Sequence, residues 1–205
     1  MAIPPDDIER QLWSLIEQRC LPGADAALID RRIWERFGEE CAVMFTDLTG
    51  FSRHVAAFGI IHFLQEIFEQ KRLLLPIAAA HGGTLIKVEA DSFLLLFPGA
   101  DGAVRCAVEM QRACQRFNEG RAPEARVLLC VGIGYGQVLR VGDRDVFGAE
   151  VNAASKLGED IATANEVLVT EGLRGAAGEL AGMAYSELAV EVPGTARAYR
   201  LEYSP

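Results

Sequence analysis

The stretch Cys41-Ala42-Val43-Met44-Phe45-Thr46-Asp47-Leu48-Thr49-Gly50 runs from an apolar segment through an aspartate to a glycine. An apolar run that ends at turn-forming residues favours a buried strand over residues 41–46. A helical pattern follows from about residue 52 to residue 81, and Pro76 inside it predicts a kink or a division. The chain is therefore expected to leave a buried strand at Asp47 and to turn sharply into a long helix.

The rest of the chain alternates strand and helix patterns. Two strands are expected around a tight turn at Asp91, and an amphipathic helix follows them. The expected elements are strands at 84–90 and 92–97, a helix at 103–117, a strand pair at 126–135 and 138–141 broken at Gly134 and Gly136, a helix from 148 to about 162, and strands at 167–170 and 197–203. This order predicts an α+β fold, in which helices flank a central, mostly antiparallel sheet.

Composition excludes several classes of function. The formal net charge of −9 and the pI of about 4.9 disfavour binding to nucleic acid, because an acidic surface repels phosphates. No apolar stretch reaches the roughly 18 residues that a membrane span needs, and the N-terminus does not resemble a signal peptide. The five cysteines lack a C-x-x-C spacing and predict buried, reduced thiols. We expect a cytoplasmic chain without a membrane span.

Two aspartates stand where predicted strands end. Asp47 follows one apolar run and Asp91 follows another, so adjacent strands would bring the two carboxylates together. Paired carboxylates suit Mg²⁺ or Mn²⁺, which prefer oxygen ligands and also bind substrate phosphates. Taken singly, either aspartate could equally open a turn or cap a helix.

Two further segments carry polar groups at helix starts. The backbone N–H groups of Thr49, Gly50 and Phe51 could receive phosphate oxygens at a helix N-terminus, although an ordinary turn explains the spacing as well. Asn152 and Lys156 lie four residues apart, on one face of the predicted helix. That pair could orient a ribose and neutralise a phosphate, or it could be a solvated helix face.

Four segments together resemble the catalytic domain of class III adenylyl and guanylyl cyclases. They are Phe45 to Ser52, Lys87-Val88-Glu89-Ala90-Asp91, Gly132-Ile133-Gly134-Tyr135-Gly136-Gln137-Val138, and Asp145 to Lys156. The resemblance runs from about Glu39 to Tyr203 and implies the ferredoxin-like fold of that family. It also implies two parts: an N-terminal helical attachment at residues 1–38 and a catalytic domain at residues 39–205.

The resemblance assigns the metal ligands and the residues that read the base. It implies that Asp47, Asp91 and the backbone carbonyl of Leu48 bind two divalent metal ions, Mg²⁺ or Mn²⁺. In the family, Lys with Asp selects adenine, whereas Glu with Cys selects guanine, and this chain has Lys87 and Asp145.

The resemblance also assigns residues to the ribose and the phosphates. Asn152 would orient the ribose, and Lys156 would stabilise charge on the α-phosphate. Thr49, Gly50 and Phe51 would bind phosphate, as would Arg197.

The implied reaction converts ATP to 3′,5′-cyclic AMP and pyrophosphate. The family's active site lies between two subunits, with the base-reading residues of one site opposite its metal ligands. We therefore expect a homodimer with two equivalent shared sites.

The sequence departs from the family pattern at several positions. Lys156 replaces an arginine, Ala90 replaces the usual glycine, and Gly134 stands where a histidine is common. The family's late phosphate-binding lysine is missing near Pro193, and Arg197 is the nearest cation. Glu89 is expected to point away from Lys87. The replacement at Lys156 and the missing lysine leave open a weak or inactive nucleotide-binding regulatory module. A guanylate cyclase is a further alternative, against which Lys87 and Asp145 speak.

Overall fold

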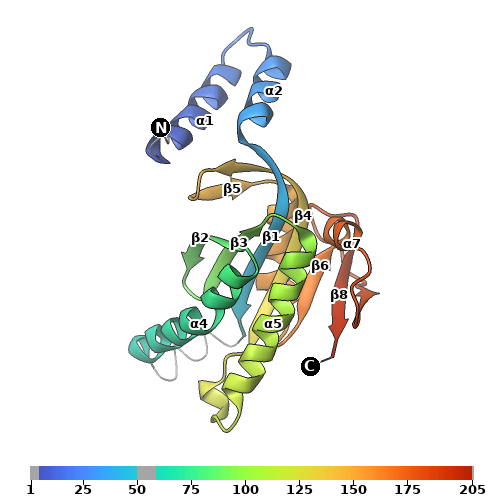
Figure 1. Cartoon of the computed structure of the whole chain (residues 1–205). Helices are drawn as coiled ribbons and strands as arrows, with labels where there is room; N and C mark the ends of the chain where they lie inside the picture. The colour runs from blue at the N-terminus through green and yellow to red at the C-terminus, as the bar shows by residue number, and fades with distance from the viewer. Residues whose placement is uncertain (1–4, 50–58, 205) are drawn as a thin grey trace.

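The computed structural model describes residues 5–49 and 59–204, in which helices flank a mixed sheet (Figure 1). The described helices are α1 (Pro5–Arg19), α2 (Ala26–Phe37), α4 (Ile60–Ala80), α5 (Ala100–Asn118), α6 (Ala149–Ser155) and α7 (Glu171–Ala177), with a 3-10 turn at Pro123–Ala125 and a π-helical turn at Lys156–Ile161. The described strands are β1 (Gly38–Leu48), β2 (Thr84–Glu89), β3 (Ser92–Phe97), β4 (Leu129–Val141), β5 (Asp145–Phe147), β6 (Val167–Thr170), β7 (Met183–Glu187) and β8 (Ala198–Tyr203).

The sheet has the strand order β2-β3-β1-β4-β6-β8-β7, and β5 pairs with β4. Among the described strand pairs, β4 and β6 run parallel and the others are antiparallel, which confirms the predicted α+β fold. Strand β1 is central: it pairs with β3 over residues 42–46 and with β4 over residues 38–48. Asp47 therefore lies near the end of a strand held on both sides.

Strand β4 corrects one prediction. The expected break at Gly134 and Gly136 is wrong, because β4 continues without interruption from Leu129 to Val141 along β1. Glycine weakens a strand but does not end it where neighbouring strands supply the hydrogen bonds. The second strand of the expected pair is β5 instead, which folds back onto β4 and begins at Asp145.

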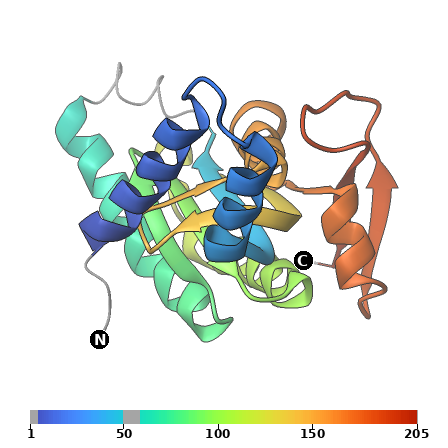
Figure 2. The same cartoon turned by 90° about the horizontal axis from the view of Figure 1, so that it is seen from above.

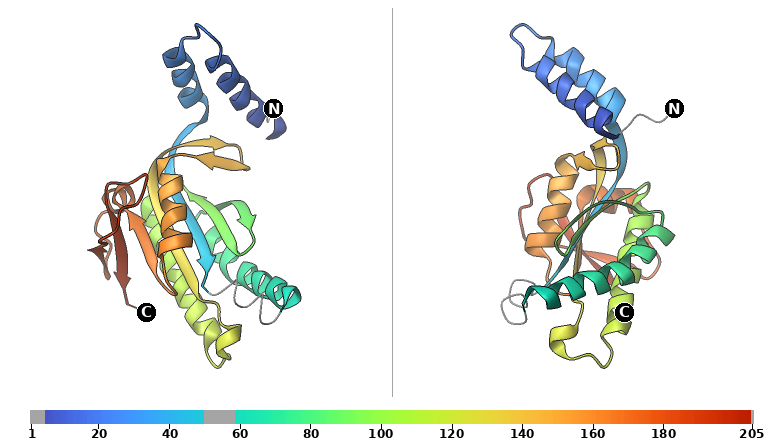
Figure 3. Two further views of the ribbon diagram at one scale, coloured as in Figure 1. Left: turned by 180° about the vertical axis from the view of Figure 1, so that it is seen from behind. Right: turned by 90° about the vertical axis from the view of Figure 1, so that its left-hand side faces the viewer.

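Different helices cover the two faces of the sheet. Helices α4, α5 and α7 pack on one face, while α6 and the π-helical turn lie across the other (Figure 3). Side chains of β1 alternate between the two layers: Met44 joins the core beneath α5, and Val43 joins the core beneath α6. The near-continuous apolar sequence of the strand follows from this burial on both faces.

Helix α6 and the following π-helical turn lie unusually close to β4. A Cβ on Gly132 would lie 2.1 Å from the carbonyl oxygen of Ala154 and 2.3 Å from the backbone nitrogen of Gly158. These distances are shorter than any side chain tolerates, so glycine at position 132 is what allows this approach.

The N-terminal helices α1 and α2 lie side by side at one end of the molecule, above the β4–β5 hairpin (Figure 2). Their apolar faces pack on one another and on Val141 of β4; the buried residues are Leu12, Ile29, Ile33, Phe37 and Val141. Across residues 5–49 and 59–204, no helix combines the length and the apolarity that a membrane crossing requires.

The turn between β2 and β3 holds a residue in a rare conformation. Ala90 has φ of 53°, in the left-handed region that glycine adopts readily and alanine does not. This is the position where a glycine was expected from the family pattern. The turn brings Asp91 to the start of β3, so the site is built on a locally strained backbone.

Replacing Ala90 by glycine should therefore stabilise the chain. We expect Ala90→Gly to raise the free energy of unfolding by about 0.5–1 kcal/mol, because relief of the left-handed strain exceeds the added entropy of the unfolded chain. Urea unfolding measures this change. The control is Ala79→Gly on the exposed side of α4, which should lose about 1 kcal/mol. Destabilisation by Ala90→Gly would contradict the conformation of this turn.

Candidate active site

Asp47 and Asp91 lie together at one end of the sheet. The antiparallel register pairs Thr46 of β1 with Phe93 of β3, so the turn that carries Asp91 lies beside the end of β1. Ser92 joins the two segments, because its Oγ donates to Asp47 Oδ1 at 3.2 Å. Asp91 is only 5% exposed. The structure thus brings together the two aspartates that the sequence singled out.

The electrostatics of the pair favour a bound cation. Burial, and after it the charge of Asp47, raise the pKa of Asp91 from 3.8 to about 7. Burial also raises the pKa of Asp47, with a smaller contribution from Glu159, while the backbone of Leu48 lowers it. Two neighbouring carboxylates with raised pKa values are costly to ionise unless positive charge is supplied.

The donor set fits a divalent metal ion. Asp91 Oδ2 is buried and has no hydrogen-bond partner among the described residues. The described residues contain no cluster of three or more His, Cys, Asp or Glu side chains placed for a metal, so Asp47 and Asp91 would need other oxygen ligands to complete the coordination. Two carboxylates with one backbone carbonyl and water is a ligand set typical of Mg²⁺, which keeps part of its hydration shell. The assignment of Leu48 as the carbonyl ligand stays a prediction.

Gln70 of α4 is a site residue that the sequence analysis missed. Its side chain is fully buried, and Nε2 donates to the backbone carbonyl of Asp91 at 2.8 Å. It thereby ties the strained turn to the helix behind it. The signal in the sequence was a polar residue on the buried stripe of α4, which otherwise contains Phe63, Leu74 and Ala78.

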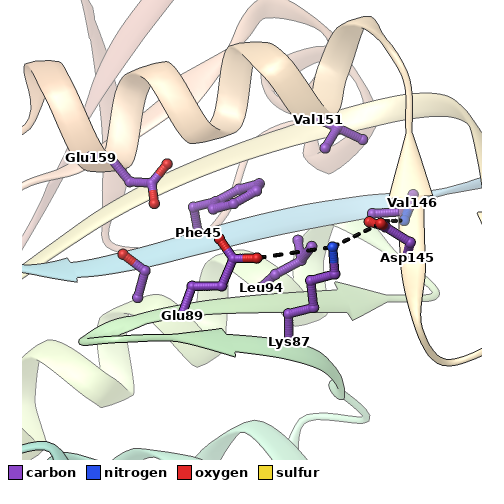
Figure 4. A pocket seen from close by; sticks show the side chains of 9 residues that line it. Phe45, Lys87, Glu89, Leu94, Asp145, Val146, Val151 and Glu159 are labelled. Atoms are coloured by element: carbon purple, nitrogen blue, oxygen red, sulfur yellow. Dashed lines mark hydrogen bonds and ion pairs between the residues drawn. The ribbon is translucent and has the colours of Figure 1, made fainter.

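A cavity of about 150 Å³ lies between β2, β3, β5 and the α6 segment (Figure 4), and Ser92, which donates to Asp47, is part of its lining. Its lining side chains are Phe45, Lys87, Glu89, Ser92, Leu94, Asp145, Val146, Val151 and Glu159. Lys87 Nζ from β2 lies 2.7 Å from Asp145 Oδ2 of β5, although the two residues are far apart in sequence. The backbone N–H of Val146 donates to the other carboxylate oxygen of Asp145 at 2.9 Å and fixes its orientation.

Glu89 corrects another expectation. It lines the same cavity as Lys87, and its Oε1 lies 3.9 Å from Lys87 Nζ (Figure 4). The prediction that it points away is wrong, because residues two apart on a strand share a face. Glu159, from the π-helical turn, adds a further carboxylate that the sequence analysis did not single out.

Asn152 and Lys156 are both exposed and lie one helical turn apart on the same face. The Lys156 N–H donates to the carbonyl of Asn152, so helical geometry continues to that residue before the π-helical turn begins. Lys156 Nζ lies 2.8 Å from Asp160 Oδ2 in an exposed ion pair.

The expected phosphate-binding residues have different environments. The backbone N–H of Thr49 donates to the carbonyl of Leu128 at 2.9 Å, so the sheet already uses this group. Gly50 and Phe51 lie outside the described residues. Arg197 is exposed before β8, 3.7 Å from Glu187, and does not line the cavity.

A comparison with known protein families identifies the family of this chain. The family described as "Adenylate and Guanylate cyclase catalytic domain" matches residues 35–199. The chain belongs to this family. The match covers the aspartate pair, the cavity and α6 of this cyclase domain.

Relatives of this cyclase domain include two bacterial adenylate cyclases. An adenylate cyclase of Streptomyces coelicolor is 34% identical over 163 residues, which are 78% of this chain and 38% of the relative. Adenylate cyclase 1 of Rhizobium meliloti is 28% identical over 138 residues, or 58% of this chain and 20% of the relative. The cyclase domain thus spans well under half the length of either relative.

Solved structures of cyclases share the fold. The adenylate/guanylate cyclase/hydrolase from Silicibacter pomeroyi has a TM-score of 0.69 at 24% identity, covering 82% of this chain and 98% of that one. The adenylyl cyclase CyaB from P. aeruginosa has a TM-score of 0.68 at 21% identity, covering 82% and 96%. These similarities confirm the predicted fold class.

The raised pKa of Asp91 predicts a pH dependence for the metal-free cyclase domain. The folded chain keeps a proton on Asp91 between about pH 4 and pH 7, where the unfolded chain has lost it. Rising pH therefore favours unfolding across this window. Chemical denaturation in EDTA should show a loss of about 2–3 kcal/mol between pH 5 and pH 8, most of it below pH 7.

Asp91→Asn should remove this loss and make the metal-free chain more stable than the parent at pH 8. The exposed substitution Asp101→Asn is the control and should leave the difference between pH 5 and pH 8 intact. An Asp91→Asn variant with the parental pH dependence would show that Asp91 is not the responsible group.

Proposed function

We propose that the chain is an adenylate cyclase, a phosphorus–oxygen lyase that converts ATP to 3′,5′-cyclic AMP and pyrophosphate. The observation that carries the proposal is the pair of Lys87 and Asp145, 2.7 Å apart in one cavity. A lysine donor can meet N1 of adenine, while an aspartate acceptor can take its exocyclic amine. Guanine presents an acceptor at O6 and a donor at N1, so it would leave buried polar groups unpaired at a cost of about 1–3 kcal/mol each.

Asp47, Asp91 and the Leu48 carbonyl would hold two divalent ions, Mg²⁺ or Mn²⁺. When bound, such ions activate the ribose 3′-hydroxyl and neutralise charge on the triphosphate. Asp91 Oδ2, which is buried and has no partner among residues 5–49 and 59–204, and the raised pKa of both aspartates support this assignment.

The residues of α6 would handle the ribose and the phosphate. Asn152 would orient the ribose, and Lys156 would leave Asp160 to stabilise charge on the α-phosphate. Lysine supplies the charge of the family's arginine but not its planar fork, so a lower rate is expected. The N–H groups of Gly50 and Phe51 and the guanidinium of Arg197 are proposed to hold the remaining phosphates.

A homodimer with shared sites is part of the proposal. Four apolar side chains lie along α4 and are between 53% and 76% exposed; they are Ile60, Ile61, Leu64 and Phe68. A stripe of this kind on a helix is typical of a surface covered by a partner, and a second copy would cover it symmetrically. The proposal also includes a cytoplasmic location, which the five free cysteines support.

One observation favours a second candidate, a nucleotide-binding module with little turnover. Both cations assigned to phosphate are occupied by carboxylates, Lys156 by Asp160 and Arg197 by Glu187. Such a module would bind ATP and regulate a partner without releasing product.

The first test is production of cyclic nucleotide from ATP and from GTP with Mn²⁺. We expect cyclic AMP from ATP, with activity abolished in Asp47→Ala. Lys87→Glu combined with Asp145→Cys should shift preference toward GTP by roughly 10-fold or more, because it exchanges the donor and acceptor pattern. ATP binding without product would favour the regulatory module. Cyclic GMP as the main product of the parent would favour a guanylate cyclase.

Complementation tests whether sites are shared between subunits. Asp91→Ala removes a metal ligand and should be inactive alone, whereas Lys156→Ala removes the phosphate cation and should keep only a low residual rate. Mixing equal amounts should restore about a quarter of parental activity, since half the dimers contain one intact site of two. Mixtures of Asp47→Ala with Asp91→Ala are the control and should stay inactive. Failure of the first mixture to recover, with subunit exchange demonstrated, would place each site within one chain.

A further inference from the structure

Glu150, in the first turn of α6, places its carboxylate against the sheet rather than in solvent. Its Oε2 accepts the backbone N–H of Tyr135 at 3.1 Å and the hydroxyl of Thr170 at 2.7 Å. Strand β6 pairs with β4 only as far as Ile133 and ends at Thr170. The carboxylate therefore satisfies a strand N–H just beyond the point where the neighbouring strand stops.

Three glycines make the space that the Glu150 side chain fills. A Cβ at Gly134 would lie 2.6 Å from Oε2, and one at Gly172 would lie 2.9 Å from Oε1. A Cβ at Gly136 would lie 3.1 Å from Cγ of Glu150. The alternating glycines of β4 and the glycine at the start of α7 thus form a cradle for the Glu150 side chain. The backbone is equally close, because a Cβ at Gly134 would lie 2.7 Å from the carbonyl oxygen of Glu150 and one at Gly172 would lie 2.5 Å from that of Tyr135.

These two hydrogen bonds of Glu150, called the tether below, hold the N-terminus of a helix that has no side-chain cap. Helix α6 has seven residues, and Gly148 at its N-cap has no side chain to bond the first N–H groups. Thr170, which donates to Glu150, also accepts the N–H of Leu173 at 3.2 Å and so caps α7. Glu150 therefore links α6 to β4, β6 and α7 at once.

We propose that Glu150 is a positioning residue, which seats α6 on the glycine cradle and thereby aims Asn152 and Lys156 at the substrate. The aim of those two residues rests on the proposed cyclase function, whereas the seating of α6 does not. Asn152 and Lys156 lie on the exposed face of the helix, while Glu150 holds the opposite side. A helix this short would shift as a unit if the tether were lost.

The experiment compares Glu150→Ala, Glu150→Gln, Lys156→Ala and the double variant Glu150→Ala/Lys156→Ala in the full chain. Steady-state rates with ATP and Mn²⁺, melting temperatures and amide hydrogen exchange are measured for each. Glu166→Ala is the matched control, because that carboxylate also accepts a backbone N–H, from Thr163 at 2.8 Å, and pairs with Arg200 away from α6.

We expect Glu150→Ala to lower kcat roughly 10- to 100-fold with KM for ATP changed less than about threefold, as a small misplacement of transition-state groups does. The loss should vanish in the Lys156→Ala background, because the two residues act through one helix. Glu150→Gln, which keeps the shape and an acceptor oxygen, should retain most of the rate. Exchange of α6 amides should quicken in Glu150→Ala, and Glu166→Ala should lower the melting temperature without changing kcat.

Two results would contradict the proposal that Glu150 positions Lys156. One is a folded Glu150→Ala variant with the parental kcat; the other is a double variant whose kcat loss equals the product of the two single losses. If the unsubstituted chain makes no cyclic nucleotide, the proposed function is wrong, but the packing of α6 through Glu150 is not affected by that result. Amide hydrogen exchange of α6 then tests the packing. Selective quickening of α6 amides would support the tether, and unchanged α6 protection would overturn it.

Discussion

The pairing of β1 with β3 on one side and β4 on the other is the constraint on which the site depends. It fixes Asp47 near the end of a strand that is paired along its length with β4 and over residues 42–46 with β3, and it carries the β2–β3 turn to the side of Asp47. Gln70 holds the backbone of that turn from α4, and Ser92 holds the carboxylate of Asp47. Two carboxylates are thus brought together in a buried place where burial raises the pKa of both and the charge of Asp47 raises the pKa of Asp91 further.

The buried aspartate pair lowers the stability of the folded chain but suits the binding of a positively charged ligand. Ala90 is strained, Asp91 Oδ2 has no partner within the described residues, and both aspartates have raised pKa values. Extensive burial on both faces of the sheet, beneath α5 and beneath α6, compensates for these local costs. A site whose polar groups lack partners in the free chain gains more when a charged ligand supplies them.

Helix α6 shows the same dependence on close packing. Gly132 and Gly158 let it approach β4, and the cradle of Gly134, Gly136 and Gly172 receives Glu150. The sequence pattern predicts that the glycines of β4 break the strand, but in the structure they make room for α6 and Glu150. A glycine that ends a strand and a glycine that makes room for a neighbouring helix look the same in the sequence. They can be told apart only by whether a helix packs on them, and that helix is distant in sequence.

The α+β class, most of the strands and helices, and the family can be predicted from the sequence, because apolar periodicity and the segments around Asp47, Asp91 and Asn152 are local patterns. Lys87 and Asp145 are evident there too, from the resemblance to the family. The folded chain was needed to show that Lys87 meets Asp145, that Glu89 shares their cavity, and that Thr49 donates its N–H to the carbonyl of Leu128. It was also needed to show that Gln70 bonds the backbone of Asp91 and that Glu150 bonds the backbone of Tyr135. These contacts join residues brought together by strand order and helix packing, which no local pattern records.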